Sequence, residues 1–299
     1  MKKIFRSNGK LLLTSEYFVL DGAEALALPT KKGQTLIVRP NDTDFLVWKS
    51  FDDQNKVWFE AEFGNDFKIV ISSDERIATT LIEILKKCRE MNPIFNPFGK
   101  KVETFLEFPT DWGLGSSSTL INNLAQWALI NPFELLWNSF SGSGYDIANA
   151  SCDTPIIYSL EDNKPIVKEV EFMPCFKDKL YFIHLNQKQN SREGINHYRS
   201  FQIDKKEVIQ KLNGITKRIL KSKTLEEFEQ GLIEHEDVIS ESLAMEKVQN
   251  RLFLEYEGVV KSLGAWGGDF VLVTFREEMH SYFNSKGYQT IVPFVDMIK

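Results

Sequence analysis

The sequence lacks several features that would place it in a special class of proteins. It has no uncharged apolar run of about 18 residues, the length that spans a bilayer. The stretch Met1 to Arg6 has no apolar segment of the signal-peptide kind. Three cysteines without a Cys-x-x-Cys pair, and four histidines without metal-ligand spacing, favour neither a disulfide framework nor a zinc site. We therefore expect a cytoplasmic protein with reduced thiols and no protein-built metal cage.

An excess of basic charge is also lacking. The chain has 36 Lys and Arg against 42 Asp and Glu, a formal net charge of −6. This balance argues against a broad surface for nucleic acid or anionic membrane, so an anion site must be local. We expect the partner to be a small-molecule substrate, and the protein to be a monomer or a homodimer.

The length and the patterns of apolar residues indicate a mixed α and β protein. At 299 residues the chain is long enough for two domains, which we place at residues 1–176 and 177–299. No internal repeat or low-complexity segment interrupts them. The patterns predict strands at 11–13, 36–39, 45–49, 57–63, 68–71, 102–108, 156–160, 166–172, 179–185, 270–275 and 290–293, and helices at 74–91, 119–130, 131–140, 205–220, 224–242, 250–263 and 277–286.

The most informative segment is the run from Pro109 to Ser118, which lies between a predicted strand and a predicted helix. A small-residue turn that opens a helix leaves backbone N–H groups beside the positive end of the helix dipole, and such a place binds phosphate. The run is not a Walker loop, since no Gly-Lys-Ser/Thr closes it, and the dinucleotide spacing is absent too. A tight connection with Ser116 as the N-cap is the alternative.

Three further segments accompany this loop in a fixed order. They are Asn8 to Gly22, Ser141 to Asp146, and Leu263 to Val273. Together the four segments resemble the ordered signature of the GHMP kinases, the family of galactokinase, homoserine kinase, mevalonate kinase and phosphomevalonate kinase. The resemblance spans nearly the whole chain. Tyr17 after a glutamate, Gly-Tyr-Asp in the third segment and Gly-Gly-Asp in the last are more similar to the mevalonate and phosphomevalonate branch than to the sugar kinases.

The resemblance implies an α+β fold with a GHMP N-terminal domain of sheet and helices and a C-terminal ferredoxin-like domain. It implies transfer of the γ-phosphoryl group of ATP, with Mg²⁺, to a hydroxyl or phosphate acceptor, mevalonate or phosphomevalonate first among them. Two alternatives stay open. One is a catalytically inactive protein that binds a phosphorylated metabolite, and the other is a diphosphomevalonate decarboxylase.

A phosphoryl-transfer enzyme needs a phosphate cradle, a metal ligand and a group that readies the acceptor. The cradle is expected at Gly113, Leu114, Gly115, Ser116, Ser117 and Ser118. The resemblance places the aspartate that accepts the substrate proton at Asp146, although this residue also suits a helix cap. Lys10 is expected to lower the hydroxyl pKa and to screen the phosphate charge, with a solvated surface lysine as the alternative.

The resemblance also implies metal and substrate ligands. Mg²⁺ is expected at Ser117 and at Glu134, where a capping role at the helix that begins with Asn131-Pro132 fits equally well. Substrate contacts are implied at Glu16, Ser191, Arg192, Gly267 and Gly268. Ser191 and Arg192 suit a carboxylate or phosphate, and an ordinary polar loop is the alternative.

Three residues depart from the family pattern. Trp112 and Trp266 stand where the family has small residues, and Ser15 stands where a glycine commonly precedes the glutamate. Bulk beside the phosphate loop narrows a nucleotide site, so the departures bear on ATP binding more than on the fold.

Overall fold

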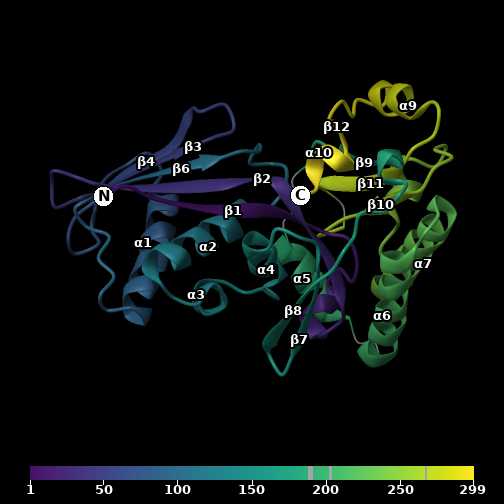
Figure 1. Cartoon of the computed structure of the whole chain (residues 1–299), viewed down its shortest axis with the longest axis horizontal. Helices are drawn as coiled ribbons and strands as arrows, with labels where there is room; N and C mark the ends of the chain where they lie inside the picture. The colour runs from purple at the N-terminus through teal and green to yellow at the C-terminus, as the bar shows by residue number, and fades with distance from the viewer. Residues whose placement is uncertain (188–190, 202–203, 267) are drawn as a thin grey trace. The chain divides into compact units, whose positions relative to one another are not determined.

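The chain forms a mixed α and β structure, drawn from a computed structural model in Figure 1. The structure describes residues 1–187, 191–201, 204–266 and 268–299, the side chains of residues 191 and 192 excepted. It divides into two compact units. Unit 1 contains Met1–Gly9, Lys32–Thr110 and Leu114–Ser151, and unit 2 contains Lys10–Lys31, Asp111–Gly113 and Cys152–Lys299. Strands β1 (Lys3–Leu12) and β2 (Ala25–Pro40) each contribute residues to both units.

Unit 1 is a layer of strands with helices on one face (Figure 1). Its further strands are β3 (Leu46–Phe51), β4 (Val57–Phe63), β5 (Ile69–Ser72) and β6 (Lys100–Leu106). The order is β5-β4-β3-β6-β2, antiparallel except for the β3–β6 pair. The helices are α1 (Glu75–Met91), α2 (Ser116–Ala128), α3 (Pro132–Ser139) and α4 (Tyr145–Ser151).

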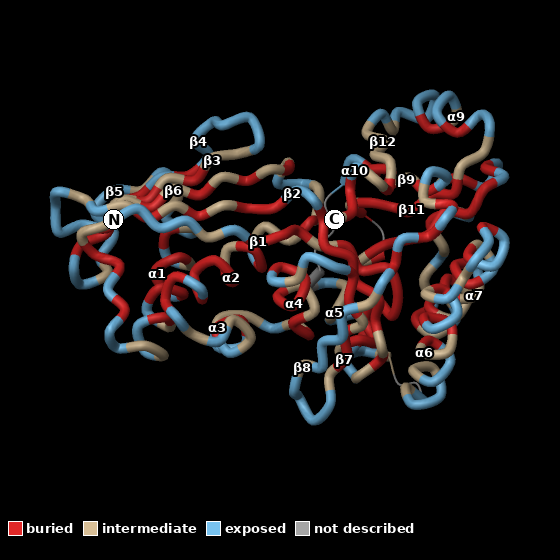
Figure 2. The backbone as a smooth tube through the Cα atoms, in the orientation of Figure 1, coloured by how far each residue is buried: buried red, intermediate tan, exposed pale blue. Residues whose placement is uncertain are grey.

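Alternation along the strands explains this layering. In β3 the side chains of Leu46, Trp48 and Ser50 are buried and those between them are partly exposed, as a strand covered on one face requires. Helix α1 turns Leu81 and Leu85 to the same core, and Figure 2 shows the buried stretches of strands and helices facing one another.

Unit 2 is built on a second, antiparallel sheet of the order β10-β11-β9-β12. These strands are β9 (Leu180–His184), β10 (Val260–Ser262), β11 (Phe270–Thr274) and β12 (Ile291–Pro293). Its helices are α5 (Ser191–Ser200), α6 (Lys205–Lys221), α7 (Leu225–Leu243), α8 (Val248–Leu252), α9 (Met279–Ser285) and α10 (Phe294–Met297). A hairpin of β7 (Ile156–Glu161) and β8 (Lys164–Glu169) pairs with residues 25–27 of β2.

The structure corrects one local prediction and one alternative. The helix predicted at 250–263 is wrong, because α8 ends at Leu252 and strand β10 follows at Val260. The segment from Ser191, for which an ordinary polar loop was the alternative, begins helix α5. The domain boundary after residue 176 stays a prediction.

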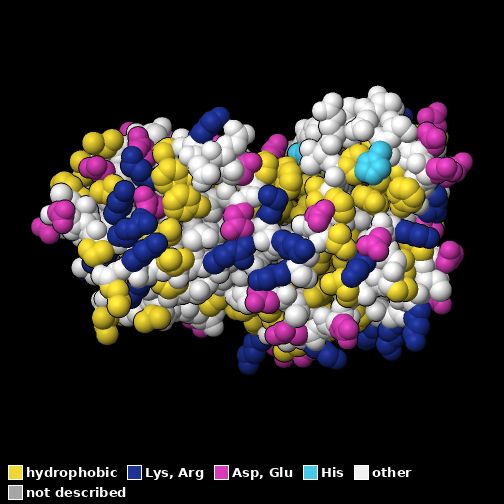
Figure 3. Space-filling model, turned by 45° about the horizontal axis from the view of Figure 1, so that its top comes forward, with side chains coloured by type: hydrophobic (Ala, Val, Ile, Leu, Met, Phe, Trp, Pro, Cys, Tyr) yellow, Lys and Arg dark blue, Asp and Glu magenta, His cyan; other side chains and the backbone are white. Residues whose placement is uncertain are grey.

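The surface carries mixed charge. On the face seen in Figure 3, Lys and Arg side chains are interspersed with Asp and Glu side chains and with hydrophobic ones. Among the described residues, no helix has both the length and the apolar character that crossing a membrane requires.

Candidate active site

The N-terminus of α2 presents backbone donors without a cap. Gly115 is the N-cap residue, at a left-handed φ of 91°, and as a glycine it makes no side-chain capping hydrogen bond to the first turn. The first turn, which contains Ser117, has no acidic residue. The helix therefore starts at Ser116, and the alternative that Ser116 is the N-cap is wrong. Uncapped N–H groups at the positive helix end suit a phosphate group.

The hydroxyl groups of this turn differ in their surroundings. Ser118 is buried, and its Oγ donates a hydrogen bond of 2.9 Å to the carbonyl of Gly115. Ser117 is exposed, Leu114 is buried, and Ser116 is partly exposed. Of the two hydroxyls at positions 117 and 118, that of Ser117 is therefore the one that a ligand reaches from solvent.

Lys10 and Asp269 meet at Gly113 within unit 2. The Nζ atom of Lys10 donates a hydrogen bond of 2.9 Å to the carbonyl oxygen of Gly113. The carboxylate of Asp269 lies so close to Gly113 that a β-carbon there would overlap it. Gly113 also has a φ of 65°, which favours glycine. Sequence reasoning did not select Asp269, although the Gly-Gly-Asp run contains it.

The side chain of Trp112 packs against residues of unit 2. Its ring packs edge-to-face on Phe270 of β11, with centroids 5.2 Å apart, and lies 6.3 Å from the ring of His184 on β9. The imidazole of His184 also contacts the carbonyl of Asp111 at 3.2 Å. The departure at position 112 thus holds residues 111–113 on the sheet of unit 2.

Asp146 lies in the first turn of α4, in unit 1. It is the second residue of the helix, and its Oδ1 accepts a hydrogen bond of 3.1 Å from the N–H of Ile147. Helix α4 packs against α2, and Ser151 donates a hydrogen bond of 3.0 Å to Asn122. Asp146 and the first turn of α2 therefore belong to adjoining helices of the same unit.

Glu134 is exposed in the first turn of α3, where Asn131 caps its N–H. The predicted start of this helix is confirmed. Nowhere in the described residues do three His, Cys, Asp or Glu side chains gather as metal ligands. A Mg²⁺ ion that arrives with nucleotide phosphates takes only one or two protein ligands, and exposed Ser117 and Glu134 are compatible with that role.

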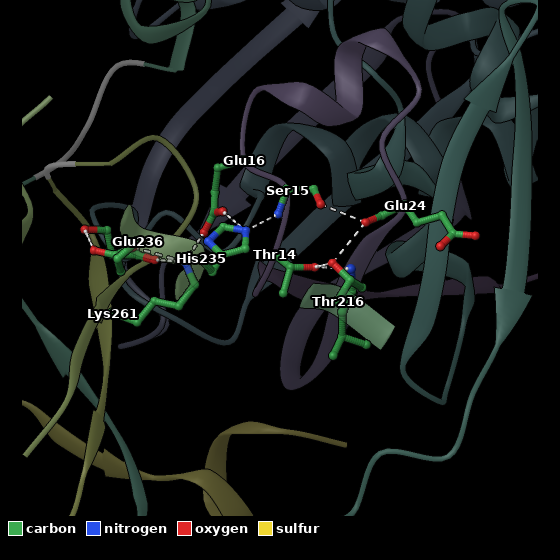
Figure 4. A network of polar contacts seen from close by, with 10 residues as sticks. Thr14, Ser15, Glu16, Glu24, Thr216, His235, Glu236 and Lys261 are labelled. Atoms are coloured by element: carbon green, nitrogen blue, oxygen red, sulfur yellow. Dashed lines mark hydrogen bonds and ion pairs between the residues drawn. The ribbon is translucent and has the colours of Figure 1, made fainter. Parts of the chain in front are cut away.

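Glu16 belongs to a buried polar cluster that the sequence did not reveal (Figure 4). Its side chain and that of Lys261 are fully buried, and the Lys261 Nζ donates to Glu16 Oε1 at 2.7 Å. Lys261 also contacts Glu236 Oε1 at 3.3 Å and the carbonyl of Ser262 at 2.8 Å. Direct contact of Glu16 with a substrate remains a prediction. In the structure its carboxyl group forms an ion pair with Lys261.

His235 completes the cluster. Its Nε2 accepts the N–H of Ser15 at 2.7 Å and lies 3.4 Å from Glu16 Oε2. Burial lowers the pKa of His235 well below its usual range, and the charge of Lys261 lowers it further. Burial raises the pKa of Glu16 to about 7 against the opposing effect of Lys261. The sequence did contain one signal for this cluster: the titratable residues His235 and Glu236 stand on the apolar side of α7, between Leu232 and Ile239.

The last glycine-rich segment contacts the turn at Tyr17. The Tyr17 hydroxyl donates a hydrogen bond of 2.7 Å to the carbonyl of Ala265, and its ring stacks on Tyr198 of α5. Trp266 is buried in the same apolar cluster, so its bulk also lies in the core of unit 2. Gly268 is buried. Gly267 and the side chains of Ser191 and Arg192 lie outside the described residues.

Comparison with solved structures identifies the architecture. The Methanococcus jannaschii mevalonate kinase aligns over 96% of this chain and 94% of its own, at 16% identity and a TM-score of 0.66. The chain has the GHMP kinase fold. The predicted α+β architecture is thereby confirmed. No family sequence model and no curated protein matches the sequence.

Two other structures with the GHMP kinase fold are equally extensive matches. The Lin0012 protein of Listeria innocua covers 98% of this chain and 97% of its own, at 16% identity and a TM-score of 0.72. The Streptococcus pneumoniae phosphomevalonate kinase, in complex with phosphomevalonate and AMPPNP, covers 95% of each chain at 13% identity and a TM-score of 0.67. At these identities the likeness establishes the fold alone.

Proposed function

We propose that this protein is an ATP- and Mg²⁺-dependent small-molecule kinase that transfers a γ-phosphoryl group to a hydroxyl or phosphate acceptor. The uncapped N-terminus of α2, with Gly115 at a left-handed φ, carries the proposal. Donors at this helix end are fixed before the ligand arrives, so they stabilise phosphate charge without reorganisation. The kinase fold of the structural neighbours and the AMPPNP bound to one of them support the same nucleotide.

The proposal gives a role to the other residues that the sequence predicts for the site. Asp146 accepts the proton of the acceptor hydroxyl. Lys10, held on the carbonyl of Gly113, adds positive charge beside the phosphate loop. Ser117 and Glu134 supply protein oxygens for Mg²⁺, which neutralises phosphate charge when bound with the nucleotide. Glu16, whose side chain is buried, is proposed to support the site through its ion pair with Lys261, and its direct contact with a substrate stays a prediction.

Mevalonate and phosphomevalonate are the leading acceptors. The support comes from neighbours named as mevalonate kinase and phosphomevalonate kinase, and from the Gly-Tyr-Asp and Gly-Gly-Asp runs. Ser191 and Arg192 are proposed to bind the acid or phosphate of the acceptor. A cytoplasmic location belongs to the same proposal, and the three free cysteines suit it.

One experiment tests the function. The pure protein is incubated with MgATP and, separately, mevalonate, phosphomevalonate, diphosphomevalonate, galactose or homoserine, while ADP, CO₂ and product mass are followed. We expect ADP together with a product that has gained one phosphoryl group. Release of CO₂ from diphosphomevalonate would assign a decarboxylase instead. Binding of a phosphorylated metabolite without any ADP would assign a non-catalytic binding protein.

A further inference from the structure

The cluster around Lys261 is balanced in charge only when one carboxyl group holds a proton. The Lys261 ammonium contacts two carboxyl groups, those of Glu16 and Glu236. The exposed fraction of each of the three side chains is at most 3%. With both carboxyl groups ionised, the cluster carries one uncompensated negative charge. An unpaired buried charge is strongly destabilising, so the cluster favours a proton on one of its two acids.

The hydrogen bonds indicate which acid holds that proton. Glu236 Oε2 accepts a hydrogen bond from the Ser262 hydroxyl at 3.1 Å, which stabilises its charge. Glu16 Oε2 has no hydrogen-bond donor among the described residues. It lies 3.4 Å from Nε2 of His235, which carries no proton because it accepts the Ser15 N–H. A proton on Glu16 Oε2 removes the repulsion between these two electron-rich atoms.

The turn that contains Glu16 is strained on both sides. Ser15 has a φ of 63° and Tyr17 a φ of 64°, values that are uncommon for residues with a side chain. Two hydrogen bonds hold Ser15 in this conformation. Its N–H donates to Nε2 of His235 and its hydroxyl donates to the carbonyl of Glu24, each at 2.7 Å. Such a conformation persists only while the surrounding contacts enforce it, so the turn depends on the cluster.

The same cluster reaches the last glycine-rich segment. Lys261 and Ser262 end strand β10. In the segment that follows, the carbonyl oxygen of Ala265 accepts a hydrogen bond from the Tyr17 hydroxyl. Trp266, at a φ of 51°, packs in the apolar cluster that contains Tyr17. The strained turn 15–17 and residues 263–266 are therefore joined at one end by the buried ions and at the other by Tyr17.

We propose that Glu16, Glu236 and Lys261 are positioning residues that form a proton-sensitive latch between the turn 15–17 and residues 263–266. The latch is closed while Glu16 is protonated and the cluster is neutral. As pH rises, Glu16 loses its proton, the cluster gains a buried negative charge and the two segments loosen. The facing groups are Lys261 of β10 and His235 and Glu236 of α7. A pKa of about 7 for Glu16 places this change near neutral pH. The inference rests on the proposed function only in that it assigns both segments to the kinase site.

The test observes Trp266 directly, without a ligand and without turnover. The full chain is labelled with 5-fluorotryptophan, and its ¹⁹F spectrum is recorded between about pH 5.5 and 8.5. Trp266→Phe assigns the Trp266 resonance, and buried Trp127 of unit 1 serves as the internal reference. We expect the Trp266 resonance to shift with a midpoint near pH 7, while that of Trp127 stays constant.

Two variants decide whether the latch is responsible. Glu16→Gln keeps the shape but cannot ionise, so the shift of Trp266 should vanish. Glu236→Gln removes the neighbouring negative charge, so the midpoint should move to lower pH. A Trp266 resonance that does not titrate in the folded wild type, or that titrates unchanged in Glu16→Gln, overturns the proposal. Should Glu16→Gln not fold, an unmoved midpoint in Glu236→Gln overturns it equally. Loss of the kinase proposal would leave these results intact, because no readout depends on activity.

Discussion

The carboxylate of Asp269 occupies the space beside the α-carbon of Gly113 that a side chain would need. Lys10 reaches the carbonyl of the same glycine, so groups of opposite charge converge on one residue of the proposed phosphate loop. Position 113 therefore requires glycine both because Asp269 fills the space of a β-carbon and because the backbone angle φ is 65°.

Substitution of Gly113 by alanine should therefore cost more than backbone strain alone. A left-handed φ costs a residue with a β-carbon about 1–2 kcal/mol, and the overlap with Asp269 adds to it. Gly287→Ala is the matched control, since its φ is 88° and no atom lies within 4 Å of the added carbon. Urea unfolding should show a larger loss for Gly113→Ala. Equal losses would mean that Asp269 moves aside at no cost.

Removing the charge of Lys10 should impair catalysis more than folding. Lys10→Met keeps the apolar stem but loses the hydrogen bond to Gly113, and we expect kcat to fall by about 10²-fold. Lys49→Met, on β3, removes a lysine that pairs with Glu60 and should leave kcat unchanged. Steady-state kinetics with the acceptor that the product assay identifies make the comparison. Wild-type kcat in Lys10→Met would contradict a catalytic role and favour the alternative of a solvated surface lysine.

Asp146→Asn should separate binding from chemistry. The amide oxygen of asparagine can still accept the N–H of Ile147, so α4 and nucleotide binding should be retained. Turnover should fall by about 10²-fold or more, because the proton acceptor is lost. Calorimetric titration with MgATP and single-turnover assays measure the two quantities. Activity within a few-fold of wild type would exclude Asp146 as the catalytic base.

His235 should make the protein less stable in acid. Its pKa in the folded state is well below 6.5, so below that pH the unfolded chain binds a proton that the folded chain does not. The free energy of unfolding then falls by up to about 1.4 kcal/mol per pH unit. Glu16 has the opposite sign: its pKa is raised from 4.5 to about 7, so its contribution is complete below pH 4.5 and is lost as pH rises to 7.

His235→Gln isolates the histidine. Glutamine can accept the Ser15 N–H and does not titrate, so this variant should lose less stability than wild type between about pH 7 and 5. His280→Gln, at an exposed histidine, is the control and should follow wild type. Urea titrations at each pH give the free energies. A parallel acid dependence of His235→Gln and wild type would contradict the assignment.

Prediction from sequence succeeded where the signal is local. The helix over 74–91 has its capping residue, Asp74, and its apolar spacing within one segment, and the structure begins that helix at Glu75. Prediction failed for the helix at 250–263, where the side chain of Gln249 binds the backbone in a non-helical conformation. The Gln249 side chain donates to the carbonyl of Gly258 at 2.9 Å and accepts the N–H of Val260 at 3.0 Å, and apolar periodicity does not register such contacts.

The site divides in the same way. The glycines of the phosphate loop are recognisable because their small size is itself the signal. The ion cluster is not, because Glu16 and Lys261 are 245 positions apart and nothing in the sequence distinguishes Lys261 from an ordinary charged residue. Their charge state depends on burial and on distance, which arise only once the chain has folded.

The pairing of early and late residues has a consequence for biosynthesis. Thr30 forms a bridge with Ile298, and the N–H of Lys299 donates to the carbonyl of Pro29 at 3.0 Å. Residues 10–31 therefore emerge from the ribosome long before these partners exist. Closing so long a loop slows folding, and Pro29 and Thr30 of β2 lack these partners meanwhile. Unit 2 is thus expected to complete its fold only after translation has supplied the last residues of this sequence.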